Sequence, residues 1–67
     1  MLSFLVIRPK DTVLVCIMRN KLDNTYSYVN LTKGYICPCK FATIEDAVKD
    51  MEKLKREGKI LRYEHVP

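Results

Sequence analysis

The segment from Thr43 to Gly58 carries the pattern that most restricts how this chain can fold. Its apolar residues recur at spacings of three and four, so they form one stripe along an α-helix. These residues are Ile44, Ala47, Val48, Met51 and Leu54. Thr43 suits the N-cap position, with Asp46 three residues later as a variant of the capping box, and Gly58 suits the left-handed residue that ends a helix. A single amphipathic helix needs an apolar surface to cover its stripe.

Strand patterns before and after this helix supply that surface. Residues 2–8 and 13–18 are apolar and β-favouring, and a turn that contains Pro9 separates them. Residues 26–31 alternate between two faces, and residues 60–66 form a last strand. We therefore predict the fold class α+β, a small antiparallel sheet of about four strands with one helix packed on a face, in the order βββαβ. The first two strands are expected to cover the helix stripe.

The length of 67 residues predicts one domain, residues 1–67, with a small core. Domains of this size usually need a further stabilising element such as a metal, a disulfide or a partner subunit. No apolar run approaches the roughly 18 residues that span a bilayer, and residues 2–7 lack the basic flank and cleavage site of a signal peptide. Together with an odd number of cysteines, these features predict a cytoplasmic protein that has no membrane partner.

Three cysteines and the only histidine form a candidate set of zinc ligands. The set is Cys16, Cys37, Cys39 and His65. A Cys3His set is typical of structural zinc, and binding of the ion contributes on the order of 10 kcal/mol to the folding of a small domain. A shared site would join the second strand, the loop Cys37-Pro38-Cys39 and the C-terminal strand. We therefore expect a structural Zn²⁺ as the element that stabilises this domain.

Two other interpretations of these residues stay open. In one, Cys16 is a small buried apolar residue, and Cys37 and Cys39 are free loop thiols. In the other, Cys37 and Cys39 carry redox chemistry, because a disulfide across one intervening residue is strained and easily reduced. Enzymatic activity is not expected. Three thiolates and the only histidine leave no open position on a zinc ion, and the chain has no glycine-rich phosphate loop.

The formal net charge is +4, and the excess of basic residues lies in the first half of the chain. Those residues are Arg8, Lys10, Arg19, Lys21 and Lys33. They are scattered over turns and strand ends, which is typical of a solvated surface, whereas a polyanion-binding face clusters its charges. Tyr26 and Tyr28 share one face of the third strand and offer aromatic surface to nucleic-acid bases or to a protein. The residues expected to bind a partner are Tyr26, Tyr28, Arg8, Arg19 and Lys21, because aromatic and arginine side chains carry most interface energy.

The helix opens with Thr-Ile-Glu-Asp-Ala-Val, residues 43–48, in a very short chain without catalytic motifs. In these features and in the candidate zinc ligands, the chain resembles small accessory proteins encoded by phages and prophages of Gram-positive bacteria. Among these it is similar to anti-CRISPR proteins, specifically to the zinc-containing inhibitors of the type II effector nuclease. The resemblance implies a stoichiometric inhibitor that binds a bacterial defence nuclease in the host cytoplasm, with zinc holding the fold of the inhibitor.

The basic charge of the chain departs from this group, in which many inhibitors are acidic mimics of DNA. We therefore expect docking against an acidic patch of the nuclease, or away from its DNA-reading surface. The alternative function is a small basic nucleic-acid-binding regulator, and the third is a thiol-active redox protein. Salt separates the first two, because binding to phosphates weakens steeply as the salt concentration rises.

Overall fold

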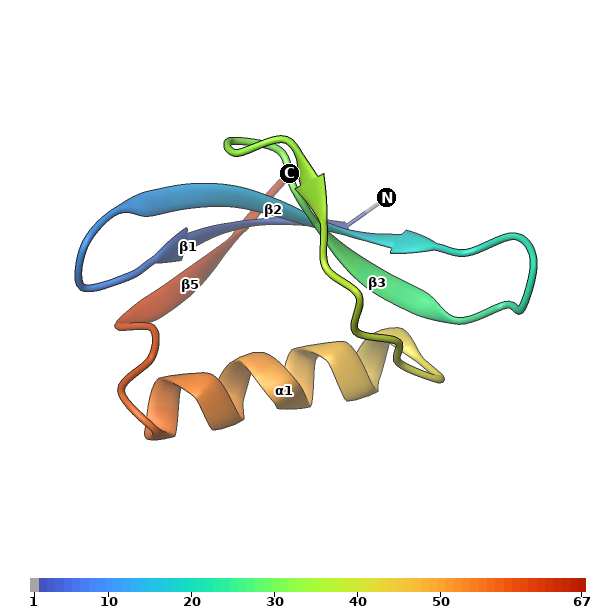
Figure 1. Ribbon diagram of the computed structural model, residues 1–67. Coiled ribbons are helices and arrows are strands. Elements are labelled where there is room, and N and C mark those ends of the chain that lie inside the picture. The colour runs from blue at the N-terminus through green and yellow to red at the C-terminus, as the bar shows by residue number, and fades with distance from the viewer. Residues whose placement is uncertain (1) are drawn as a thin grey trace.

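The computed structural model describes residues 2–67 and contains five strands and one helix. In chain order these are β1 (Leu2–Ile7), β2 (Thr12–Arg19), β3 (Tyr26–Asn30), β4 (Tyr35–Ile36), α1 (Ile44–Arg56) and β5 (Arg62–Val66). The strands form one antiparallel sheet in the order β4-β3-β2-β1-β5. The helix lies across one face of this sheet (Figure 1). The α+β class with one helix on the sheet is confirmed, and the sheet has one strand more than expected.

The helix begins and ends where the sequence predicts. Thr43 is the N-cap, and its Oγ1 accepts a hydrogen bond of 3.1 Å from the backbone N–H of Asp46. Acidic residues occupy the first turn and basic residues the last turn, which complements the helix dipole. Gly58 follows the C-terminal end with φ of 76°, a left-handed conformation that glycine adopts without a steric penalty. Local signals therefore fix both ends of α1.

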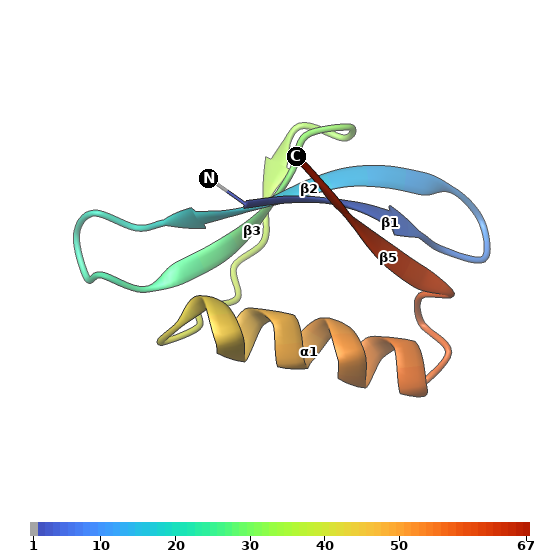
Figure 2. The same cartoon turned by 180° about the vertical axis from the view of Figure 1, so that it is seen from behind.

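The chain returns from α1 to the edge of the sheet next to β1. Ser3 pairs with Val66 and Ile7 with Arg62, so β5 runs antiparallel beside β1. Figure 2 shows this edge from behind, with β5 crossing above the helix. The strand begins at Arg62, later than the expected position 60, because Ile60 turns its side chain into the core and is only 5% exposed. This return places the two ends of the described chain on neighbouring strands.

The core lies between α1 and the face of the sheet that α1 covers. It consists of Phe4, Val6, Val13, Ile17, Ala47, Met51 and Ile60. The ring of Phe4 also contacts the rings of Tyr63 and His65 on β5, at centroid distances of 5.8 and 5.6 Å. The first two strands thus cover the helix stripe, as the sequence predicts.

The opposite face of the sheet carries no helix, and we call it the helix-free face. Side chains alternate along each strand, so the residues between the core positions point to this face. Its apolar members are Leu5, Ile7, Leu14, Cys16, Met18, Val29, Ile36 and Val66. Met18, Ile36 and Val66 are exposed to solvent, whereas Cys16 is fully buried among its neighbours. Both faces of β2 are therefore apolar.

Candidate functional site

The loop between β4 and α1 brings two of the predicted site residues together. Cys37 donates its backbone N–H to the carbonyl oxygen of Tyr28 at 2.9 Å, and the carbonyl oxygen of Cys39 accepts a hydrogen bond from Ser27 at 2.7 Å. The backbone N–H of Cys39 also donates to Cys37 Sγ at 3.4 Å. Burial, together with the hydrogen bond to Cys37, raises the pKa of Cys39 to about 11. A thiol that remains protonated at neutral pH is a poor nucleophile, which disfavours the redox interpretation.

The other two candidate zinc ligands lie elsewhere in the sheet. Cys16 pairs with Ser3 and Val29 and points to the helix-free face. His65 pairs with Phe4 on the helix side of β5, the edge strand opposite to β4. Neighbouring strands are about 4.8 Å apart, and three strands separate β4 from β5. Zinc binds its ligands at about 2.0–2.3 Å, and this arrangement does not bring the four side chains together at one point.

The metal expectation is accordingly not supported by the geometry. Within residues 2–67, no group of three or more His, Cys, Asp or Glu side chains is placed to hold a metal ion. The buried, apolar surroundings of Cys16 match those of a small core residue. Zinc binding stays a prediction of the sequence, and elemental analysis of the purified protein tests it.

Two of the predicted partner-binding residues are engaged inside the fold. The hydroxyl of Tyr28 donates to the carbonyl oxygen of Ala47 and lies 3.1 Å from Asp50 Oδ2, so it joins β3 to α1. Burial, followed by the charge of Asp50, raises the pKa of this hydroxyl above its usual value. Arg8 forms an ion pair with Asp11. Partner binding by these two residues stays a prediction.

Arg8, Asp11 and Lys33 form a charged cluster at the β1–β2 turn. Arg8 Nε and Nη2 donate to the two carboxylate oxygens of Asp11 at 2.5 and 2.6 Å, and Lys33 Nζ lies 3.3 Å from Asp11 Oδ2. The hydrogen bond from Arg8, helped by Lys33, lowers the pKa of Asp11 to about 2. A second aspartate, Asp23, has its pKa lowered to about 2, first by Lys40 and then by Thr25.

These lowered pKa values predict a loss of stability in acid. A carboxylate whose folded-state pKa is below its ordinary 3.8 stabilises the fold above that value, and the contribution is lost as the pH falls toward 2. We expect the midpoint temperature of thermal denaturation to decrease as the pH is lowered from 4 to 2. Asp11→Asn should make this decrease smaller without abolishing it, since Asp23 titrates in the same range. Circular dichroism melts at each pH measure the effect. Glu64→Gln, which removes an exposed carboxylate on β5, is the control, and equal slopes for both variants would contradict the assignment.

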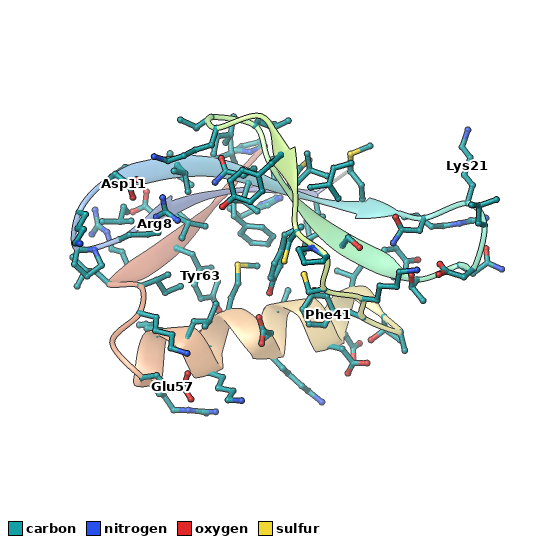
Figure 3. All side chains as sticks on the ribbon, viewed as in Figure 1. Arg8, Asp11, Lys21, Phe41, Glu57 and Tyr63 are labelled. Carbon is teal, nitrogen blue, oxygen red and sulfur yellow. The ribbon has the colours of Figure 1, made fainter. Side chains whose placement is uncertain are left out.

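The remaining predicted partner residues lie at the other end of the sheet. Figure 3 shows Lys21 at the tip of the β2–β3 hairpin and Arg8 at the opposite end of the molecule. Arg19 and Tyr26 are a cross-strand pair beside this tip. Both line a groove of about 410 Å³ that runs between this end of the sheet and the start of α1. The lining of this β2–β3 groove consists of Leu2, Ile17, Met18, Arg19, Tyr26 and Ile44.

The β2–β3 groove combines exposed apolar surface with unpaired positive charge. Ile44 is 39% exposed, and Leu22 at the hairpin tip is fully exposed. Neither Arg19 nor Lys21 forms an ion pair with any residue in the part of the chain that the structure describes. Asp23, the acidic residue of the hairpin, is paired with Lys40 at 2.6 Å. An apolar hollow with a free cation at its rim is suited to hold an apolar side chain next to an acidic one.

The sequence predicted three residues at this end of the sheet, Arg19, Lys21 and Tyr26, but not the groove itself. Ile44 was expected to belong to the buried stripe, but it lies at the first position of α1, where the helix reaches the end of the sheet. Met18 falls on the helix-free side of β2, and its exposure depends on strand order. The position of Ile44 at the helix start was the one available signal that its side chain could be partly exposed.

Comparison of this chain with protein families, with curated proteins and with solved structures found no match. Over residues 2–67, no helix has the length and apolar character needed to cross a membrane.

Proposed function

We propose that this chain is a non-enzymatic binding protein that holds an apolar side chain of a protein partner in the β2–β3 groove. Arg19 and Lys21 attract acidic residues of the partner beside that anchor. The observation that carries the proposal is the coincidence of exposed apolar lining with cations that have no acidic partner at the same end of the sheet. A buried anchor in a pocket with a charged rim is the usual energetic centre of a protein interface.

The resemblance noted in the sequence makes a bacterial defence nuclease the first partner to test. A basic inhibitor suits an acidic patch of such a nuclease, and the β2–β3 groove is where this chain presents free positive charge. Inhibition through this contact needs no catalytic group in the inhibitor. The narrower function that we propose is therefore stoichiometric inhibition of a type II effector nuclease.

A nucleic-acid partner is less well supported by the arrangement of the side chains. Tyr28 is directed to the helix, and Arg8 lies at the opposite end of the sheet from Lys21 (Figure 3). A single strand needs a continuous track of cations with aromatic rings between them. The structure separates those components.

The test is calorimetric titration of the purified type II nuclease with the wild type and two variants. Arg19→Glu reverses the free charge, and Ile44→Asp places a carboxylate in the groove. We expect each to weaken binding by at least about tenfold, as for an interface residue of high energy. Arg62→Glu on β5 reverses an exposed charge at the far edge and should leave binding unchanged.

The outcomes separate the parts of the proposal. Absence of a complex at micromolar concentrations removes the nuclease as a partner. Binding that Arg19→Glu and Ile44→Asp leave intact removes the β2–β3 groove as the interface. Affinity for single-stranded DNA that falls about a thousandfold or more between 50 and 200 mM salt points to the alternative, a nucleic-acid-binding regulator.

A further inference from the structure

A second hollow lies between the sheet and the second half of α1, and we call it the core cavity. Its volume is about 240 Å³. Apolar side chains from both layers form its walls: Val6, Val13 and Val15 from the sheet, and Met51, Leu54 and Ile60 from the helix and the loop after it. Arg8, Asn30 and Tyr35 contribute polar groups to the same lining. The core cavity therefore has an apolar interior with a few polar groups, which is the usual composition of a small-molecule site.

The polar groups come from adjacent positions in the fold. Asn30 and Tyr35 are a cross-strand pair of β3 and β4. The proximity of Tyr35 adds to the larger effect of Asp11 in raising the pKa of Arg8. Tyr35 is half exposed, and the side chain of Arg8 is 30% exposed, so these two residues lie where the core cavity meets solvent. Asn30 connects them to the interior.

Asn30 supplies a hydrogen-bond donor to the core cavity. The residue is only 5% exposed, and its Oδ1 accepts a hydrogen bond of 2.9 Å from the backbone N–H of Lys33. Its Nδ2 donates no hydrogen bond to any residue from 2 to 67, and no side-chain polar atom in that range is both sealed from solvent and unpaired. The amide nitrogen is therefore open to solvent, and Asn30 lines the core cavity. It has two N–H groups that can donate to an acceptor of a bound ligand.

Arg8 adds positive charge at the mouth. Its Nε and Nη2 are used by Asp11, but Nη1 makes no contact with that carboxylate. Asp11 also pairs with Lys33, so two cations share one anion in this cluster. The mouth keeps one positive charge in excess, and Nη1 is a donor that Asp11 does not use.

We propose that the core cavity binds a small aliphatic carboxylate, with its hydrocarbon chain between the sheet and α1 and its carboxylate at Arg8 and Asn30. The volume is below the roughly 300–1,000 Å³ of pockets for drug-sized ligands, so the ligand is a medium-chain acid rather than a larger lipid. The apolar walls take the chain, and the charge at the mouth distinguishes an acid from a neutral molecule of the same shape. This site is separate from the β2–β3 groove and does not depend on the proposed partner.

The test compares octanoate with octanamide, which has the same chain but no charge. Both are titrated into the full-length protein labelled with ¹⁵N, and amide shifts give the site and the affinity. We expect octanoate to shift the amides of residues 13–15, 30 and 51–54 and to bind about tenfold more tightly than octanamide, because its bonds to Arg8 are charge-assisted. Arg8→Gln should remove this preference, by weakening octanoate much more than octanamide.

Two further variants keep the proposal falsifiable if Arg8→Gln disturbs the fold. Val15→Phe fills the core cavity and should weaken both ligands at least about tenfold while the protein remains folded by circular dichroism. Arg62→Gln removes an exposed cation on β5 and should bind both ligands as the wild type does. Equal affinity of the wild type for octanoate and octanamide overturns the carboxylate assignment. Undiminished binding by Val15→Phe, or no binding of either ligand, overturns the site.

Discussion

Truncation of Met51 to alanine is expected to remove a large part of the stability of this fold, about 2–5 kcal/mol in the free energy of unfolding. Met51 is 2% exposed and lies in the middle of the helix stripe, in contact with the core on the sheet. The only helix is held to the sheet through this stripe. Small domains have unfolding free energies near the low end of the usual range of about 5–15 kcal/mol, so a loss of this size leaves a substantial unfolded fraction.

Urea denaturation followed by circular dichroism at 222 nm measures this effect, with the midpoint and slope compared between the variant and the parent. Leu22→Ala is the matched control, because it also shortens an apolar side chain but at a fully exposed position. That substitution should change stability by no more than about 0.5 kcal/mol. A midpoint for Met51→Ala that equals the midpoint for Leu22→Ala would show that α1 does not pack on the sheet through Met51.

Truncation of Phe4 to alanine is expected to cost about 3–5 kcal/mol and to release β5 from the sheet. Phe4 is 6% exposed in β1, next to the edge strand. Its ring contacts Tyr63 edge-on, with an interplanar angle of 77°, and also contacts His65. Removal of the ring takes away both the core packing of β1 and the aromatic contacts of β5.

Hydrogen exchange measures the loss of core packing and the release of β5 separately. Amides of Arg62–Val66 should lose protection to a greater degree than those of β2 and β3, because β5 has β1 as its only neighbouring strand. Leu61→Ala, at a 56% exposed position just before β5, should leave the exchange pattern of the sheet unchanged. Unaltered protection of β5 in Phe4→Ala would mean that backbone pairing alone holds this edge.

The helix and four of the five strands follow from local sequence signals. Thr43 and Gly58 specify the ends of α1, and Pro9 marks the turn between the first two strands, so no long-range contact is needed to place them. The strand β4 was not predicted, because Tyr35–Ile36 is two residues long and gives no alternating pattern. It exists as a continuation of β3 across the turn at Gly34, which has φ of 75°.

The candidate sites were harder to predict, because they depend on strand order and on which face of a strand meets the helix. Val13 and Ile17 face the core, and Cys16 between them faces away, but both sets are apolar and the sequence pattern does not distinguish them. His65 is distant from the cysteines of the loop because β5 joins the sheet beside β1. The β2–β3 groove and the core cavity arise where α1 crosses the sheet, which no local pattern encodes.

The pairing of Ser3 with Val66 also determines how this molecule responds to tension. A load applied between the two ends of the described chain pulls β1 and β5 apart, starting at the end of the ladder where Ser3 and Val66 pair. The hydrogen bonds of an antiparallel ladder are perpendicular to the strands, so the load acts along these bonds and breaks them one after another. When strands are loaded in shear, all hydrogen bonds between them resist the force together, whereas at this edge the hydrogen bonds are loaded one at a time. Under force, β5 would therefore separate first, at low force, and leave the hairpins of β1 to β4 intact.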